Sequence, residues 1–141
     1  MDRRSFLGLA AAAVATSALG ACASMVTTPV APVGGIVYLP IRNYPSLASA
    51  GGSLKILPSG AATPLYILEL EGGGYAVLSP ICTHLGCTVN IEGVNLVCPC
   101  HGSTYDRAGE VLQGPAERSL VRIPSRLTED GVLEIDLRGA D

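Results

Sequence analysis

The chain has 141 residues, of which 48% are hydrophobic and 15% are charged, and its formal net charge is −3. This length allows one compact domain with a tail but not two domains, and the high apolar content argues against a disordered chain. Nine basic against twelve acidic residues leave no positive surplus for a phosphate backbone, which argues against nucleic acid as a partner. Five cysteines are an odd number, and two histidines allow only one histidine-dependent metal centre.

Residues 1–21 have the pattern of an export signal. Arg3 and Arg4 precede an apolar run of about 14 residues, Phe6–Leu19, which is shorter than the roughly 20 residues that a membrane-spanning helix needs. The stretch D-R-R-S-F-L resembles the twin-arginine signal, although Asp2 and Gly8 depart from the usual pattern, which has Ser or Thr before the arginines and often Lys after Phe-Leu. That route exports proteins already folded around a cofactor, so the resemblance implies a cofactor and a periplasmic or other extracytoplasmic location. An ordinary secretory signal is the alternative.

The sequence L-G-A-C that ends this segment resembles a lipobox, in which the cysteine is lipidated and becomes the mature N-terminus. Lipidation of Cys22 would account for the odd cysteine and would hold the protein at a membrane. Two alternatives remain: an ordinary cleavage site near Cys22, or an uncleaved segment kept as an anchor. Residues 22–35 contain Pro and Gly and no charge, which predicts a flexible tether.

Short apolar runs broken by Gly, Pro, Asn and Asp fill residues 36–141 and predict strands. No stretch outside the signal has a convincing 3.6-residue period, although residues 44–50 could hold one short helical turn. We therefore predict an all-β domain, an antiparallel β sandwich or small barrel. The candidate strands are Ile36–Ile41, Leu54–Leu57, Leu65–Leu70, Tyr75–Ser79, Thr88–Ile91, Val94–Val97, Glu110–Leu112, Leu120–Ile123 and Val132–Leu137.

Residues 80–115 differ in composition from the rest, because they hold four of the five cysteines and both histidines. The motifs are C-T-H-L-G-C at 82–87 and C-P-C-H-G-S at 98–103, each after a predicted strand. A hairpin built from Thr88–Ile91 and Val94–Val97 joins them. Because a hairpin returns the chain to its starting point, we expect the two loops to meet at one tip of the domain.

Cys82 and Cys98 offer two thiolates, and His84 and His101 offer two imidazoles. Such a set could hold zinc in a structural module, although the spacing does not match the common zinc patterns. In an oxidising compartment the other cysteines of the two loops, at positions 87 and 100, could form a disulfide that closes about a dozen residues. Such a bond would stabilise the fold by roughly 3 kcal/mol.

At these motifs the chain resembles the Rieske iron–sulfur family, in the form found in quinol-oxidising cytochrome bc-type complexes. The resemblance covers about residues 36–137 and implies one [2Fe–2S] cluster on a subdomain of two loops and a hairpin. It places Cys82 and Cys98 on the inner iron and His84 and His101 on the outer, exposed iron. It also implies the disulfide between positions 87 and 100.

Further positions can be matched to the family one by one. Ser103 and Tyr105 match hydroxyls that hydrogen-bond a bridging sulfide and a cysteine sulfur, which raises the potential by stabilising the more negative reduced form. Leu85 matches the residue that shields the cluster, and Gly114 with Pro115 resembles the loop that covers its other side. The residue at 117 is Glu where the bc-type loop has a second proline, which predicts a looser cover.

The resemblance implies an electron-transfer subunit of an oxidoreductase complex. Two neutral imidazoles in place of thiolates raise the cluster potential, and His84 or His101 would hydrogen-bond quinol and couple electron to proton transfer. The implied partners are a membrane-bound cytochrome b and a c-type cytochrome. An alternative is the Rieske small subunit of a periplasmic molybdenum oxidase such as arsenite oxidase. A Rieske oxygenase is excluded, since no histidine remains for its mononuclear iron.

Overall fold

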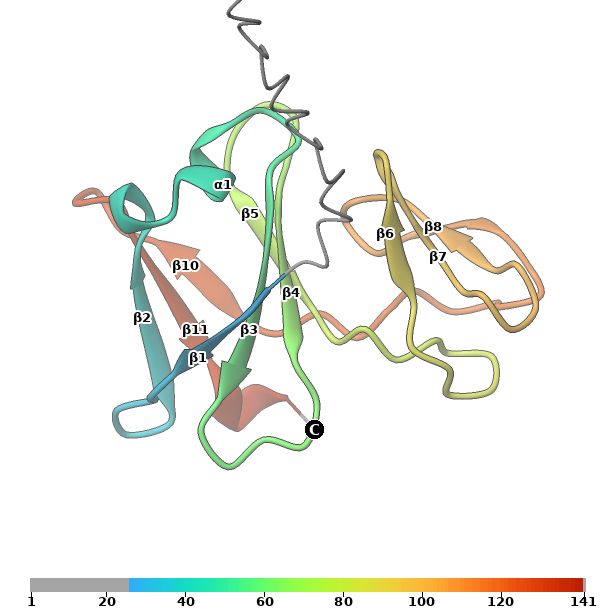
Figure 1. The fold of residues 1–141 in the computed structure, drawn as a ribbon, viewed down its shortest axis with the longest axis horizontal. Coiled ribbons are helices and arrows are strands. Elements are labelled where there is room, and N and C mark those ends of the chain that lie inside the picture. Colours follow the sequence, from blue (N-terminus) through green and yellow to red (C-terminus); the bar gives the residue numbers. More distant parts are fainter. Residues whose placement is uncertain (1–25, 141) are drawn as a thin grey trace, which may run out of the picture.

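The computed structural model describes residues 26–140, so the predicted export signal and the predicted lipid site at Cys22 lie outside the described residues. The regular structure of the described part is mostly β strand (Figure 1). Its helical elements are short: the 3₁₀ turns η1 (Ile41–Asn43) and η2 (Leu137–Gly139), and the helix α1 (Pro45–Ala48). Within residues 26–140, no helix is long and apolar enough to cross a membrane. The strands are β1 (Thr27–Val30), β2 (Ile36–Pro40), β3 (Ser53–Pro58), β4 (Leu65–Glu69), β5 (Tyr75–Leu78), β6 (Asn90–Glu92), β7 (Asn95–Val97), β8 (Thr104–Tyr105), β9 (Val111–Gln113), β10 (Ser125–Leu127) and β11 (Val132–Asp136).

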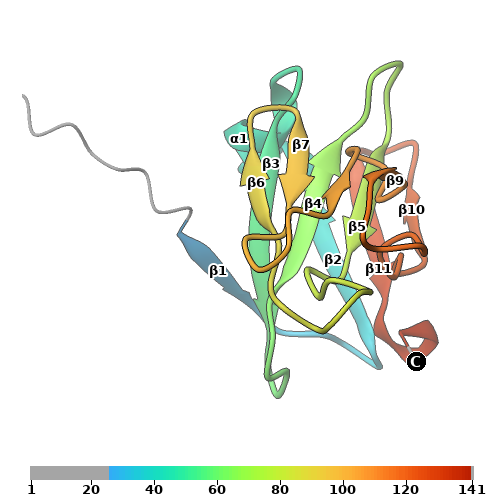
Figure 2. The ribbon, with the colours of Figure 1, turned by 90° about the vertical axis from the view of Figure 1, so that its right-hand side faces the viewer.

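The strands form three sheets. The first sheet has the order β1-β3-β4-β5, the second β10-β11-β2 and the third β6-β7-β8-β9. Among these strands, β1 and β3 pair in parallel and the other pairs are antiparallel. Figures 1 and 2 show the first sheet as the middle layer, with the second sheet on one face and the third on the other. The prediction of an all-β, antiparallel sandwich is confirmed.

Strand β4 is buried along four consecutive residues because both faces of its sheet are covered. Leu65 and Ile67 point into a first core, which the first sheet shares with β2 and β11. Tyr66 and Leu68 point the other way, into a second core shared with the third sheet. The alternation of side chains along one strand thus divides the apolar run between two cores.

The third sheet and its loops form what we call the loop subdomain, residues 80–120. The chain enters and leaves it side by side, since the N–H of Ser79 donates to the carbonyl of Val121 at 2.9 Å. On the other side of the second core, the buried hydroxyl of Tyr66 donates to the carbonyl of Val89 at 2.9 Å. Because Leu120 is buried in the same core, the subdomain extends about five residues beyond the predicted boundary at 115.

The prediction of a flexible tether over residues 22–35 is wrong for residues 27–30. These residues form β1, which adds to the edge of the first sheet, with Val30 packed against the first core. The carbonyl of Val30 accepts the N–H of Ser59 at 2.9 Å, so the polar groups of the preceding residue, Pro29, face away from β3. A proline is tolerated at such an edge position because its missing N–H has no partner to lose.

Two other differences concern strands. The predicted strand Leu120–Ile123 is wrong: this segment makes one isolated bridge and crosses from the second core, at Leu120, to the first core, at Ile123. The strand that continues the second sheet is β10, which follows it. Strand β8 escaped prediction because it has only two residues, with an irregular register against β9. The predicted hairpin between the two motifs is confirmed as β6 and β7.

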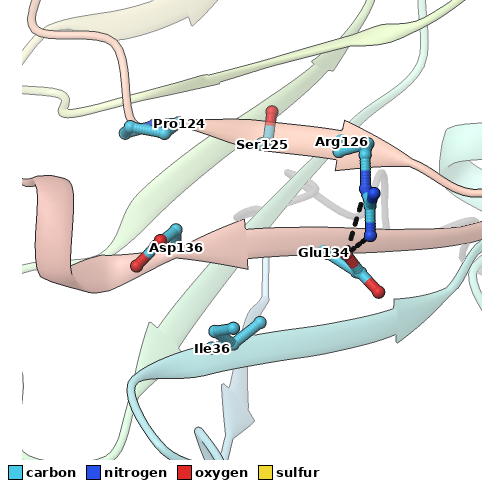
Figure 3. Close-up of a pocket in the computed structure, with 6 residues that line it drawn as sticks. All are labelled: Ile36, Pro124, Ser125, Arg126, Glu134 and Asp136. Carbon is cyan, nitrogen blue, oxygen red and sulfur yellow. Dashed lines mark hydrogen bonds and ion pairs between the residues drawn. The ribbon is translucent and has the colours of Figure 1, made fainter.

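The outer face of the second sheet carries the charged residues Arg126, Glu134 and Asp136 and lies away from the loop subdomain (Figure 1). A pocket of about 250 Å³ lies on this face, and its lining includes Arg126 and Glu134, whose side chains form an ion pair at 2.6 Å (Figure 3). The arginine side chain is 74% exposed, and ion pairs that exposed contribute little to stability. Substitutions on this face should therefore have little effect on the rest of the fold.

Candidate metal centre

The two motif loops have the same backbone hydrogen-bond pattern. In the first loop, the N–H of Cys82 donates to the carbonyl of Cys87 at 2.7 Å. In the second, the N–H of Cys98 donates to the carbonyl of Ser103 at 2.8 Å. In both cases the bond joins a residue to the fifth residue after it, so the loops are equivalent turns that begin at a cysteine.

A glycine closes each turn. The N–H groups of Gly86 and Gly102 donate to the carbonyls of the first cysteine of their loops, both at 3.0 Å. Both glycines have φ near +80°, a left-handed conformation that side chains with a Cβ disfavour. The C-x-x-x-G spacing shared by the two motifs is therefore a requirement of the turn.

The thiols and the imidazoles lie in different environments. Cys82 and Cys98 are unpaired by disulfide and almost completely buried, with 3% and 1% of their surfaces exposed. His84 and His101 are exposed, and their rings lie edge to face with centroids 5.1 Å apart. The structure therefore brings the four predicted ligand residues to one tip, with sulfur on the inside and imidazole on the outside.

A disulfide joins Cys87 and Cys100 and links the two loops, as predicted. The sulfur atoms of these two residues and of Cys98 lie within 4.8 Å of one another. Since the first two sulfurs are bonded to each other, only the third is available as a thiolate. The disulfide thus holds the loops together without using a predicted ligand.

The hydroxyl of Tyr105 lies beneath the first loop. Its oxygen is 3.3 Å from Sγ of Cys82 and accepts the N–H of Thr83 at 3.3 Å. Burial raises the pKa of the Cys82 thiol, but hydrogen bonds from Tyr105 and from backbone groups favour the thiolate and bring the pKa below its usual value. Burial, followed by the bond to sulfur, raises the pKa of Tyr105, which therefore keeps its proton as a donor.

Thr83 is a functional residue that the sequence prediction missed. Its Oγ1 donates to the carbonyl of Arg118 at 2.6 Å and lies 3.2 Å from the Tyr105 hydroxyl. The threonine therefore fixes the segment after Pro115 against the first loop. No signal in the sequence pointed to it, because the hydrogen-bonded groups are 35 residues apart.

Ser103 is fully buried, and its Oγ accepts the N–H of Ala116 at 3.0 Å. Because this bond uses a lone pair, the hydroxyl proton is free to donate elsewhere. Gly114 and Pro115, which precede Ala116, are exposed, and Leu85 is 67% exposed at the tip of the first loop. The predicted cover loop thus binds the second loop through Ser103.

Comparison with known proteins agrees with this geometry. The model of the Rieske [2Fe-2S] domain matches residues 52–125. The cytochrome b6-f complex iron-sulfur subunit of Synechococcus elongatus is 42% identical over 85 residues, covering 53% of this chain and 47% of the relative. The cyanelle cytochrome b6-f complex iron-sulfur subunit 1 of Cyanophora paradoxa is 45% identical over 82 residues, covering 55% of this chain and 33% of the relative. The chain therefore spans less than half the length of these relatives.

A solved structure extends the match to the fold. The cyanobacterial plasma membrane Rieske protein PetC3 from Synechocystis PCC 6803 superposes with a TM-score of 0.52 and 30% identity, over 64% of this chain and 92% of the other. The matched family is that of the Rieske [2Fe-2S] domain, which binds an iron–sulfur cluster and not zinc. The domain match includes both motif loops, the hairpin between them, and strands β3, β4 and β5 of the first sheet. This chain therefore belongs to the Rieske [2Fe-2S] family and carries the domain that binds a [2Fe–2S] cluster.

Proposed function

We propose that this protein is an electron-transfer subunit in which Cys82 and Cys98 hold one iron of the cluster and His84 and His101 hold the other. The observation that carries the proposal is the pairing of two buried thiols with two exposed imidazoles on equivalent loops. The donor set fits the group, since Rieske centres use two histidines on one iron and cysteines on the other. When bound, the cluster accepts and returns one electron.

The residues around the thiols favour a high potential. The Tyr105 hydroxyl donates toward Sγ of Cys82, and the free proton of Ser103 can donate to a second sulfur. Hydrogen bonds to sulfur stabilise negative charge, and the cluster is more negative after it gains an electron. Both residues therefore shift the equilibrium toward the reduced form.

The exposed histidines suit contact with a quinol. The imidazoles of the site reach the surface whereas the thiols of Cys82 and Cys98 are buried, and Leu85, next to His84 in the chain, is also exposed. A quinol bound there would donate a hydrogen bond to His84 or His101 and release its proton to that ring as its electron leaves. This apolar tip is also the surface that a membrane-bound cytochrome b would contact, with a c-type cytochrome as the electron acceptor.

The relatives support a membrane complex as the setting, because they are named as iron–sulfur subunits of cytochrome b6-f complexes. We infer that export by the twin-arginine route places the protein on the periplasmic side. We also infer that lipidation of Cys22, or an uncleaved signal, holds it at the membrane. No contact in the described residues favours the molybdenum oxidase alternative.

Purified protein tests the ligand assignment. We expect about two iron atoms per chain and a paramagnetic signal in the reduced state. His84→Ala and His101→Ala should each abolish both, whereas Cys22→Ser should keep the cluster but release the protein from membranes. A cluster that survives loss of either histidine would refute the assignment. Co-purification of the native chain with cytochrome b would test the partner.

A further inference from the structure

Arg107 bridges the loop subdomain and the first sheet. It lies in the turn between β8 and β9, and its Nε donates to the carbonyl of Glu69 at 2.8 Å. Its Nη2 donates to the carbonyl of Gly52, which precedes β3. The two acceptors belong to neighbouring strands of the first sheet, so one guanidinium fixes the turn at two points.

The bridge of Arg107 adds to the apolar packing of Leu70, which follows Glu69 and contacts the second core. A groove of about 620 Å³ separates the tip of the β6–β7 hairpin from the turn after β4, and Val94, Glu71 and Arg107 line it. Among the described residues, Arg107 forms no ion pair with a carboxylate. At this groove, the hydrogen bonds of Arg107 join the turn between β8 and β9 to the first sheet.

Hydrogen bonds within the turn couple the position of Arg107 to that of Tyr105, which lies two residues earlier. Oδ1 of Asp106 accepts the N–H groups of Ala108 and Glu110, both at 2.9 Å. The N–H of Asp106 in turn donates to the carbonyl of Glu110 at 2.9 Å. These bonds make the segment rigid, so a displacement of Arg107 moves the start of the turn as well.

Contacts through the first sheet connect the two partners of the Tyr105–Cys82 hydrogen bond. Cys82 follows β5 by four residues, and β5 pairs with β4, which ends at Glu69. Arg107 lies in the turn that follows Tyr105, and its side chain donates a hydrogen bond to the backbone carbonyl of Glu69. The first sheet is thus a common frame for the sulfur acceptor and for its hydroxyl donor.

We propose that Arg107 is a positioning residue that sets the geometry of the Tyr105 hydrogen bond to Cys82 and thereby raises the potential of the cluster. This inference rests on the proposed function, which makes Cys82 a cluster ligand. Arg107 acts through its two backbone acceptors and through the turn, rather than through direct contact with the cluster.

A double-substitution cycle on the cluster-loaded full chain tests the proposal, with the midpoint potential as the readout. Arg107→Met should lower the potential when Tyr105 is present and leave it unchanged in the Y105F background, because the hydrogen bond is then already absent. Arg107→Lys keeps the charge but cannot reach both carbonyls in the same way. It should lower the potential as Arg107→Met does, and it serves as the test if the methionine variant fails to fold.

The control is Arg126→Met, which removes an arginine from the outer face of the second sheet and should not change the potential (Figure 3). Equal lowering by Arg107→Met in both backgrounds would overturn the proposal, since it would show an effect of charge alone. An unchanged potential in Arg107→Met or in Arg107→Lys would overturn it too. An unchanged potential in Tyr105→Phe alone would also overturn the proposal, because the hydrogen bond would then have no redox effect, whereas failure of the proposed function would appear as absence of the cluster.

Discussion

The hydroxyl oxygen of Tyr105 lies 3.3 Å from Sγ of Cys82, although 23 residues separate the two along the chain. Tyr105 comes from β8, after the second motif loop, and Cys82 begins the first loop. The hydrogen bond therefore joins the two halves of the loop subdomain at the buried side of the metal centre. Under the proposed function, this hydrogen bond acts on a cluster ligand.

Removing this hydroxyl should lower the midpoint potential. A hydrogen bond to a charged acceptor contributes about 1.5–3 kcal/mol, and only its difference between the two redox states changes the potential. We therefore expect Tyr105→Phe to lower the potential by tens of millivolts, since about 59 mV corresponds to a tenfold change for one electron. Redox titration followed by circular dichroism measures it. Tyr38→Phe, on the exposed face of β2, is the control and should match the wild type.

Ser103→Ala should change both the potential and the stability. The potential should fall, because a hydroxyl donor near the sulfurs is lost. The free energy of unfolding should fall by about 1–3 kcal/mol, because the buried N–H of Ala116 loses its acceptor. Ser125→Ala, at an exposed position of β10, should change neither. A stable Ser103→Ala protein with an unchanged potential would contradict the role given to this hydroxyl.

The disulfide should stabilise the loops rather than bind iron. Cys87 and Cys100 are 13 residues apart, and closing a loop of this size stabilises a fold by roughly 3 kcal/mol in the chain-entropy model. The double variant Cys87→Ser/Cys100→Ser should therefore lose the cluster faster on heating. Its iron content when freshly prepared at low temperature should equal that of the wild type. Complete absence of iron under those conditions would give the two cysteines a role in cluster assembly.

Strand β1 should contribute to stability although it lies in the segment predicted to be a tether. Val30 is partly buried against the first core, and Val→Ala there removes two methyl groups, so we expect a loss of about 1 kcal/mol. Val26 is 82% exposed and provides a matched control, because Val26→Ala should leave the free energy of unfolding unchanged. Equal denaturation midpoints for the two variants would show that β1 does not add to the folded unit.

The carboxylate of Asp136 should make a pH-dependent contribution at the end of β11. Hydrogen bonds from the Arg138 side chain and backbone lower its pKa from 3.8 to about 2. Since the folded pKa is the lower one, this stabilisation is present above about pH 4 and is lost as the pH falls through 2. Wild type and Asp136→Asn should therefore differ in stability at neutral pH and converge at about pH 2. A carboxyl pKa near 4 in NMR titration would contradict the interaction.

Much of the centre could be predicted because its information is local. The spacing of Cys82 and His84, and of Cys98 and His101, lies within single turns, and each turn is closed by a glycine a few residues away. The hairpin that brings the loops together is also short. Period-two patterns located most strands, since alternate residues face a core and a surface.

What the sequence by itself determined was therefore the donor set, the two turns, the disulfide and the all-β class. Only the tertiary structure decided that Thr83 binds Arg118, that Arg107 binds Gly52, and that residues 27–30 add a strand beside β3. Those contacts join groups 35 and 55 residues apart, or pair a Pro-containing segment with an edge whose position depends on the whole sheet. Local patterns carry no information about such pairings, because their partners become neighbours only when two cores pack on opposite faces of one sheet.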